Sequence, residues 1–179
     1  MEENLRKIIK ILTKESKTIS TMESCTGGAL VSEITNIEGA SNVLKYSAIT
    51  YSNEYKIKMG VDENIIKTYS VYSKETAREM SKTISNFTNS NYAIGITGKL
   101  NKPDENNNFG KDNEVFISIY NKDKNKYYDY NLIVTNKTRK ENKNQIIELV
   151  STKLLEILKQ NNQKQKNKEE KIREEKKKT

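Results

Sequence analysis

The sequence predicts an α/β fold, a three-layer α/β/α sandwich around a mixed, mostly parallel β-sheet. Up to residue 97, short β-like runs alternate with apolar stretches at helical spacing, which is typical of parallel strands joined by helices. Two later runs, at 114–120 and 126–134, have the pattern of a hairpin and add antiparallel pairing. The chain has 179 residues, which is the size of one ordinary domain with a buried core.

The elements before residue 90 follow from hydrophobic spacing and turn residues. Leu5, Ile8 and Leu12 repeat at helical spacing near the start of the chain. Ser73 is a favoured N-cap residue, and Glu75 places an acidic group in the first turn after it. The predicted elements here are a helix at 4–17, a strand at 18–22, a helix after Gly28, a turn at 39–41, a strand at 43–51, and helices at 62–69 and 73–86.

The C-terminal half contains a surface loop, a hairpin and a long helix. Residues 98–113 are polar and include the only proline, Pro103, so they form the loop. An apolar stripe that ends at Leu158 predicts a helix that Thr138 caps. We therefore divide the chain into one domain, 1–159, and a basic tail, 160–179, which is either a solvated helical extension or disordered. The other predicted elements are strands at 91–97, 114–120 and 126–134 and a turn at 121–125.

Composition indicates a folded, soluble, cytoplasmic protein. The apolar fraction is 34% and the charged fraction 31%, and the distinct apolar runs argue against global disorder. No apolar run reaches the roughly 18 to 20 residues that span a bilayer, and the acidic N-terminus lacks a signal-peptide pattern. The single cysteine, Cys25, cannot form an internal disulfide and offers no metal cluster. We expect no metal, no cofactor and no membrane partner.

The positive charge does not by itself indicate nucleic-acid binding. The formal net charge is +8, and residues 160–179 contribute eight Lys and Arg against four Glu, a net of +4. The remaining +4 is spread among acidic residues and has no nucleic-acid-binding motif beside it. We therefore expect no specific nucleic-acid partner, and we expect deletion of the tail to remove most of any salt-sensitive DNA binding.

The most informative segment lies between the first predicted strand and the helix after it. It reads Glu23-Ser24-Cys25-Thr26-Gly27-Gly28. This segment puts a serine hydroxyl and several backbone N–H groups at one helix N-terminus. Because the chain has no histidine, a nucleophilic Ser24 needs another base, and the best candidate is Lys56. Without a base, Ser24 is only a helix N-cap and the two glycines a tight turn.

Five ordered segments together resemble the C-terminal domain of CinA, the competence/damage-inducible protein, a family of nicotinamide mononucleotide deamidases. The resemblance covers about residues 5 to 160. The matching segments are 23–28, Gly39-Ala40-Ser41, Thr50-Tyr51-Ser52-Asn53-Glu54-Tyr55-Lys56, Val71 with Ser73-Lys74-Glu75-Thr76-Ala77, and Gly95-Ile96-Thr97-Gly98.

The resemblance implies an activity and a set of roles. Family members hydrolyse the carboxamide of nicotinamide mononucleotide to nicotinic acid mononucleotide and ammonia, in pyridine nucleotide recycling. It assigns Ser24 as the nucleophile and Lys56 as its base, and it implies the three-layer fold with a mixed sheet. Many members carry an additional N-terminal domain similar to molybdopterin-binding proteins, so we expect this chain to correspond to the stand-alone form. A small nucleotide is the expected partner, and homo-oligomerisation stays open.

Amide hydrolysis needs a nucleophile, a base, an oxyanion site and a proton donor for ammonia. Lys56 can be the base only if burial or a nearby cation disfavours its ammonium form. Tyr51 is the third catalytic candidate, to orient Lys56 or relay its proton, with packing as the alternative. Glu23 either orients Lys56 or complements the helix dipole. Cys25 is an alternative nucleophile or a small packed residue.

The expected substrate-binding residues lie in three segments. Free N–H groups at Cys25, Thr26 and Gly27 can hold an oxyanion or a phosphate. The remaining candidates are Gly28, Thr97, Gly98 and Arg139. Arg139 and Lys143 have the spacing of two family arginines that are four residues apart, and either can hold phosphate.

One segment departs from the family. Where the family usually continues Thr-Gly into Ile-Ala-Gly-Pro-Gly-Gly, this chain continues Thr97-Gly98 into Lys99-Leu100-Asn101-Lys102-Pro103 and loses the glycines. Glycines let a backbone approach a ligand closely, so specificity or activity differs if this loop forms part of the site. The alternative to an enzyme is therefore a non-catalytic nucleotide-binding or partner-binding module of the same fold.

Overall fold

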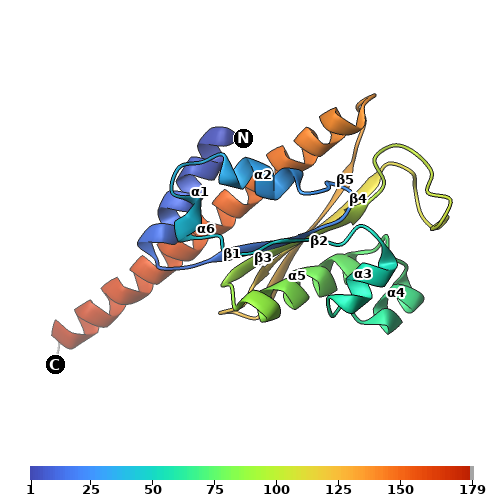
Figure 1. Ribbon diagram of the computed structural model, residues 1–179. Helices are drawn as coiled ribbons and strands as arrows, with labels where there is room; N and C mark the ends of the chain where they lie inside the picture. Colours follow the sequence, from blue (N-terminus) through green and yellow to red (C-terminus); the bar gives the residue numbers. More distant parts are fainter. Residues whose placement is uncertain (178–179) are drawn as a thin grey trace.

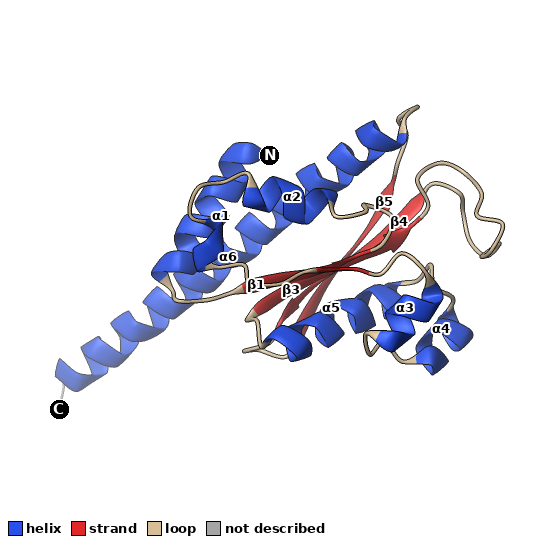
Figure 2. Ribbon diagram, viewed as in Figure 1, coloured by secondary structure: helices blue, strands red, loops and turns tan. Residues whose placement is uncertain are grey.

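A computed structural model describes residues 1–177 (Figures 1 and 2). It contains one five-stranded sheet, six α-helices and a short 3₁₀ helix within these residues. The elements are α1 (Glu2–Lys14), β1 (Ile19–Glu23), α2 (Ala29–Thr35), η1 (Ala40–Asn42), β2 (Ala48–Ile49), α3 (Asn53–Lys58), α4 (Glu63–Tyr69), α5 (Lys74–Thr88), β3 (Tyr92–Gly98), β4 (Glu114–Asn121), β5 (Lys126–Ile133) and α6 (Arg139–Lys177).

The sheet is mixed, as predicted. Its strand order is β2-β1-β3-β4-β5. β1 pairs in parallel with both β2 and β3, whereas β4 is antiparallel to β3 and to β5. Four of the five strands therefore run in one direction, and β4 runs in the other. In the β1 and β3 register, Glu23 lies opposite Ile96, so the segments after these strands meet at one edge of the sheet.

Helices cover both faces of the sheet, which confirms the three-layer fold class (Figure 1). α1, α2 and α6 lie on one face and enclose the larger apolar core, while α3, α4 and α5 lie on the other. α5 packs closely on β3 because Gly95 has no side chain. A Cβ there would lie 2.2 Å from the carbonyl oxygen of Ala77 in α5.

The predicted strand at 43–51 is too long. Only Ala48–Ile49 is a strand, at the edge of the sheet, and Leu44 contributes an isolated bridge to Ile19. The aromatic and β-branched side chains of this stretch are divided between surface and core: Tyr46, Ile49 and Tyr51 are exposed, whereas Val43 and Thr50 are buried. The sequence also did not predict α3. Its N-cap is Ser52, whose side chain accepts a hydrogen bond from the N–H of Tyr55.

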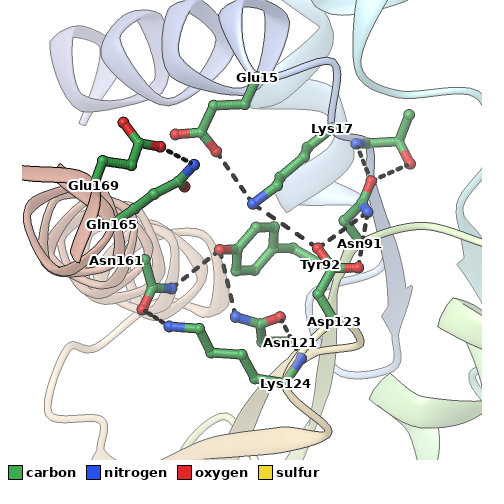
Figure 3. Close-up of polar contacts among 11 residues, drawn as sticks. Glu15, Lys17, Asn91, Tyr92, Asn121, Asp123, Lys124, Asn161, Gln165 and Glu169 are labelled. Carbon is green, nitrogen blue, oxygen red and sulfur yellow. Dashed lines mark hydrogen bonds and ion pairs between the residues drawn. The ribbon is translucent and has the colours of Figure 1, made fainter. Parts of the chain in front are cut away.

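α6 continues beyond the apolar stripe as an exposed helix to Lys177, and the last two residues of the predicted tail lie outside the described part of the chain. The first turn of this extension is hydrogen-bonded to the start of β3 (Figure 3). There, Asn161 and Asn121 donate to the buried Tyr92 hydroxyl at 3.1 and 3.5 Å. No helix within residues 1–177 has the length and apolarity needed to cross a bilayer.

Candidate active site

A buried carboxylate stabilises the turn between β1 and α2. Glu23 is fully buried and accepts hydrogen bonds from Thr26 Oγ1 at 2.6 Å and from the N–H groups of Leu30 and Val31 at 3.0 Å each. Of the two roles considered for Glu23, the contacts match the helix N-terminus rather than Lys56. They fix the segment that carries Ser24.

Ser24 and Lys56 are in direct contact. Lys56 Nζ lies 3.0 Å from Ser24 Oγ and donates a second hydrogen bond, of 2.7 Å, to the carbonyl oxygen of Thr50. Lys56 projects from α3 and is only 1% exposed, and Ser24 is 8% exposed. The unpredicted helix α3 thus brings the two residues together across 32 positions of sequence.

Burial lowers the pKa of Lys56 from 10.5 to about 8, against a smaller opposing effect of nearby Cys25 and Asp104. A side chain with this pKa is about 10% neutral at pH 7, and a neutral amine can accept a proton. Burial acts in the opposite direction on the thiol beside Ser24. It raises the pKa of Cys25 from 9.0 to about 12, so the thiol stays protonated and is a poor nucleophile.

One of the three expected N–H donors is already engaged. The N–H of Gly27 donates to the carbonyl oxygen of Ser24 at 2.9 Å, so the expectation of a free donor at Gly27 is wrong. Within residues 1–177, no backbone carbonyl accepts from the N–H of Cys25 or Thr26. Both glycines of the turn have left-handed backbone, with φ of +60° at Gly27 and +91° at Gly28, which is the physical reason for glycine here.

A cavity of about 550 Å³ opens above Ser24. The loop between β3 and β4 projects from the same end of the sheet as α3 and forms a large part of its wall (Figure 1). The lining residues are Ser24, Cys25, Tyr51, Ser52, Asn53, Tyr72, Gly98, Lys99, Leu100, Lys102, Pro103, Asp104, Glu105, Asn106, Asn107 and Arg139.

Three of the predicted substrate-binding residues line the cavity, and the other four do not. Cys25, Gly98 and Arg139 line it, whereas the side chain of Thr97 is buried and donates to the carbonyl oxygen of Val71 at 2.9 Å. The other three predicted residues, Thr26, Gly27 and Gly28, are in the turn beneath and are not among the lining residues.

Tyr51 lies at the cavity rim and contacts a different partner from the one expected. Its side chain is exposed, and its hydroxyl accepts a hydrogen bond from Arg139 at 3.3 Å. Within residues 1–177, no hydrogen bond joins Tyr51 to Lys56. The pair of Tyr51 and Arg139 instead links the β2 to α3 segment with the first turn of α6.

Three further lining residues form a connected polar group that the sequence did not single out. The hydroxyl of Tyr72 donates to the carboxylate of Asp104. The ammonium of Lys99 lies 5.0 Å from the centre of the Tyr72 ring and 3.4 Å from the carboxylate of Asp112. Asp104 stands where the family pattern has a glycine, and Lys99 belongs to the same altered loop, which was the available signal. Tyr72 gave none.

Comparisons with known proteins point to one family. The family model described as the CinA C-terminal domain matches residues 2–160. A CinA-like protein from Endomicrobium trichonymphae is 35% identical over 148 residues, which are 82% of this chain and 34% of that protein. A CinA-like protein from Flavobacterium psychrophilum is 41% identical over 113 residues, 62% of this chain and 26% of that protein. This chain therefore spans about a third or less of these relatives.

Solved structures share the fold. A CinA superfamily protein from Klebsiella pneumoniae superposes with a TM-score of 0.81 at 20% identity, over 89% of this chain and 98% of that one. A competence/damage-inducible protein from Agrobacterium tumefaciens gives a TM-score of 0.74 at 28% identity, over 88% of this chain and 92% of that one.

Proposed function

Because the chain belongs to the CinA C-terminal domain family, we propose that it is an amidohydrolase that converts nicotinamide mononucleotide to nicotinic acid mononucleotide and ammonia. The observation that carries the proposal is the buried hydrogen bond of 3.0 Å between Lys56 and Ser24 at the floor of a nucleotide-sized cavity. A lysine that is 1% exposed and contacts a serine hydroxyl is unusual for a purely structural pair, because burying an ammonium is costly.

In the first half of the reaction, neutral Lys56 accepts the proton of Ser24 as Oγ attacks the carboxamide carbon. The carbonyl oxygen of Thr50 accepts one N–H of the amine and so holds Nζ within 3.0 Å of Ser24 Oγ. The N–H of Cys25, which lines the cavity beside Ser24, stabilises the oxyanion of the tetrahedral intermediate, a contribution of roughly 3 to 4 kcal/mol per donor in measured hydrolases. Protonated Lys56 then gives its proton to the departing nitrogen, and ammonia leaves.

In the second half, water hydrolyses the acyl ester on Ser24. Lys56 is neutral again after ammonia has left, so it takes a proton from the attacking water. The tetrahedral intermediate collapses, Lys56 returns the proton to Ser24 Oγ, and nicotinic acid mononucleotide is released. The cycle uses one water and restores both side chains. A place in cytoplasmic pyridine nucleotide recycling, with a small nucleotide rather than nucleic acid as partner, is part of the same proposal.

The second candidate is a non-catalytic nucleotide-binding or partner-binding module. The observation that favours it is the loop at 99–113, which has lost the family glycines and carries Lys99 and Asp104 into the cavity wall. Tight nucleotide binding without ammonia release would identify this function.

Ammonia release from nicotinamide mononucleotide by the purified chain tests the proposal. We expect Ser24→Ala and Lys56→Ala to abolish release while circular dichroism and the melting temperature show a folded protein. Lys58→Ala is the matched control, because Lys58 is on the same helix with 59% of its side chain exposed, and it should retain activity. Release by either of the first two variants would exclude the mechanism, and no release by the unmodified chain would exclude the function.

A further inference from the structure

Lys99 is a charged residue at a buried position in the cavity wall. It comes one residue after β3, at the sheet edge where Ser24 follows β1. Only 2% of its side chain is exposed, although it lines the cavity together with Ser24. Taking an ammonium out of water costs free energy unless strong partners compensate it.

The compensation within the described chain is incomplete. The carboxylate of Asp112 is 3.4 Å from the Lys99 ammonium, and 54% of the Asp112 side chain is exposed, so water weakens this ion pair. The Tyr72 ring lies 5.0 Å away and adds a cation–π contact. The hydroxyl of this ring is bound to Asp104, whose carboxylate also attracts Lys99 electrostatically without a direct ion pair. The result is a buried cation in the cavity wall whose ion pair within residues 1–177 is to a half-exposed carboxylate.

The other cations near the cavity are placed differently. Arg139 is exposed and donates to Tyr51, and Lys143 lies beside the turn, with its Nζ 3.4 Å from where a Cβ on Gly27 would be. Lys102 lines the cavity but is exposed. Lys99 is therefore the one cation among the described lining residues whose position is fixed by burial.

We propose that Lys99 determines specificity for phosphorylated substrates by binding the phosphate of the nucleotide when its carboxamide is at Ser24. The inference rests on the proposed function. A phosphate is a stronger partner than Asp112, because it carries up to two charges and three oxygens, and it displaces the half-exposed carboxylate on binding. The loop that follows Lys99 lacks the glycines that would allow a close backbone approach to the ligand, so a charged side chain at its start offers another way to hold the phosphate.

The test compares nicotinamide mononucleotide with nicotinamide riboside, which has the same carboxamide and ribose but no phosphate. Lys99→Met preserves length and suits a buried site beside an aromatic ring. We expect it to raise KM and the dissociation constant for the mononucleotide about 10- to 100-fold, the range for loss of one charged hydrogen bond, and to leave those for the riboside within about twofold. Lys99→Arg should restore part of the preference for the mononucleotide.

Two variants distinguish phosphate binding by Lys99 from a structural role of Lys99 in the loop. Lys111→Met removes an equal charge from an exposed position of the same loop, outside the lining residues, and should change neither ligand. Asp112→Asn removes the competing carboxylate, so binding of the mononucleotide should be unchanged or tighter. If Lys99 only anchors the loop through Asp112, Asp112→Asn will weaken binding as Lys99→Met does, and the inference is wrong.

Calorimetric binding keeps the two proposals distinguishable. Hydrolysis of the mononucleotide with an equal loss for both ligands in Lys99→Met would exclude the role of Lys99 and leave the proposed function intact. Binding without hydrolysis, with the mononucleotide selectively weakened by Lys99→Met, would exclude the enzyme and support the phosphate site.

Discussion

The rate of the proposed reaction should depend on pH through Lys56. This side chain can accept the Ser24 proton only when neutral, and kcat/KM reports ionisations of the free enzyme. With a pKa of about 8, the neutral fraction is about 1% at pH 6, about 10% at pH 7 and about 90% at pH 9. We therefore expect kcat/KM to rise about tenfold per pH unit below pH 8 and to level off above it.

Burial sets the size of this effect. A lysine with the ordinary pKa of 10.5 instead of about 8 would have about 300 times less neutral amine at pH 7. Initial rates of ammonia release at low nicotinamide mononucleotide concentration, from pH 6 to 10 at constant ionic strength, measure the profile. The phosphate group of the substrate ionises near pH 6, so the rise must be followed above pH 6.5.

Lys56→Arg is the informative variant for the same assay. Its guanidinium stays protonated throughout the range, so the base is lost while the positive charge remains. The rate should fall by about 10² to 10⁴, the usual contribution of a general base. Lys58→Arg, on the same exposed helix face as its ion-pair partner Glu54, should keep the wild-type profile. A flat profile between pH 6.5 and 9, or a Lys56→Arg enzyme with the wild-type profile, would refute the reasoning.

Three further predictions concern stability, each measured by denaturant unfolding. Lys56→Met should raise the free energy of unfolding at pH 7 relative to wild type. Because the pKa of Lys56 is about 8 in the folded protein and 10.5 in the unfolded chain, this advantage should shrink by about 3 kcal/mol as the pH rises from 8 to 10.5. A difference that does not change with pH would contradict this. Glu23→Gln puts an NH₂ group against backbone donors and should cost about 1.5 to 3 kcal/mol. Tyr92→Phe removes the acceptor shared by Asn121 and Asn161 and should cost about 1 to 3 kcal/mol, whereas no loss would show that water replaces it.

Sequence patterns predicted most of the fold because most elements bury one regular face. α1 and α5 repeat their apolar residues at helical spacing, and β3 is buried throughout, so pattern and environment agree. The pattern was misleading at 43–51, where Tyr46, Ile49 and Tyr51 are exposed and only Ala48–Ile49 is strand. α3 has six residues, and its buried face includes a lysine, so it gave no apolar period at all.

The sequence predicted those residues of the candidate site that belong to short, recognisable segments. Ser24 and Lys56 stood out because each belongs to a short matching segment and because no histidine was available as a base. Contacts made across the fold were not predictable in this way. The hydrogen bond from Tyr72 to Asp104 joins two loops 32 positions apart, and the bond from Arg139 to Tyr51 spans 88 positions, so neither has a local pattern.

The choice of nucleophile follows from the same apolar surroundings that activate the base. Ser24 and Cys25 are adjacent, and in water the thiol would be the stronger nucleophile because it ionises more readily. Burial raises the pKa of Cys25 to about 12 and lowers that of Lys56 to about 8. Apolar surroundings favour the neutral form of each group. They therefore keep the Cys25 thiol protonated and unreactive, and they make the Lys56 amine a better base. Of the two side chains, Ser24 is the one that hydrogen-bonds to the amine within residues 1–177, at 3.0 Å, so it can lose its proton to Lys56 as it attacks, without ever forming a free alkoxide.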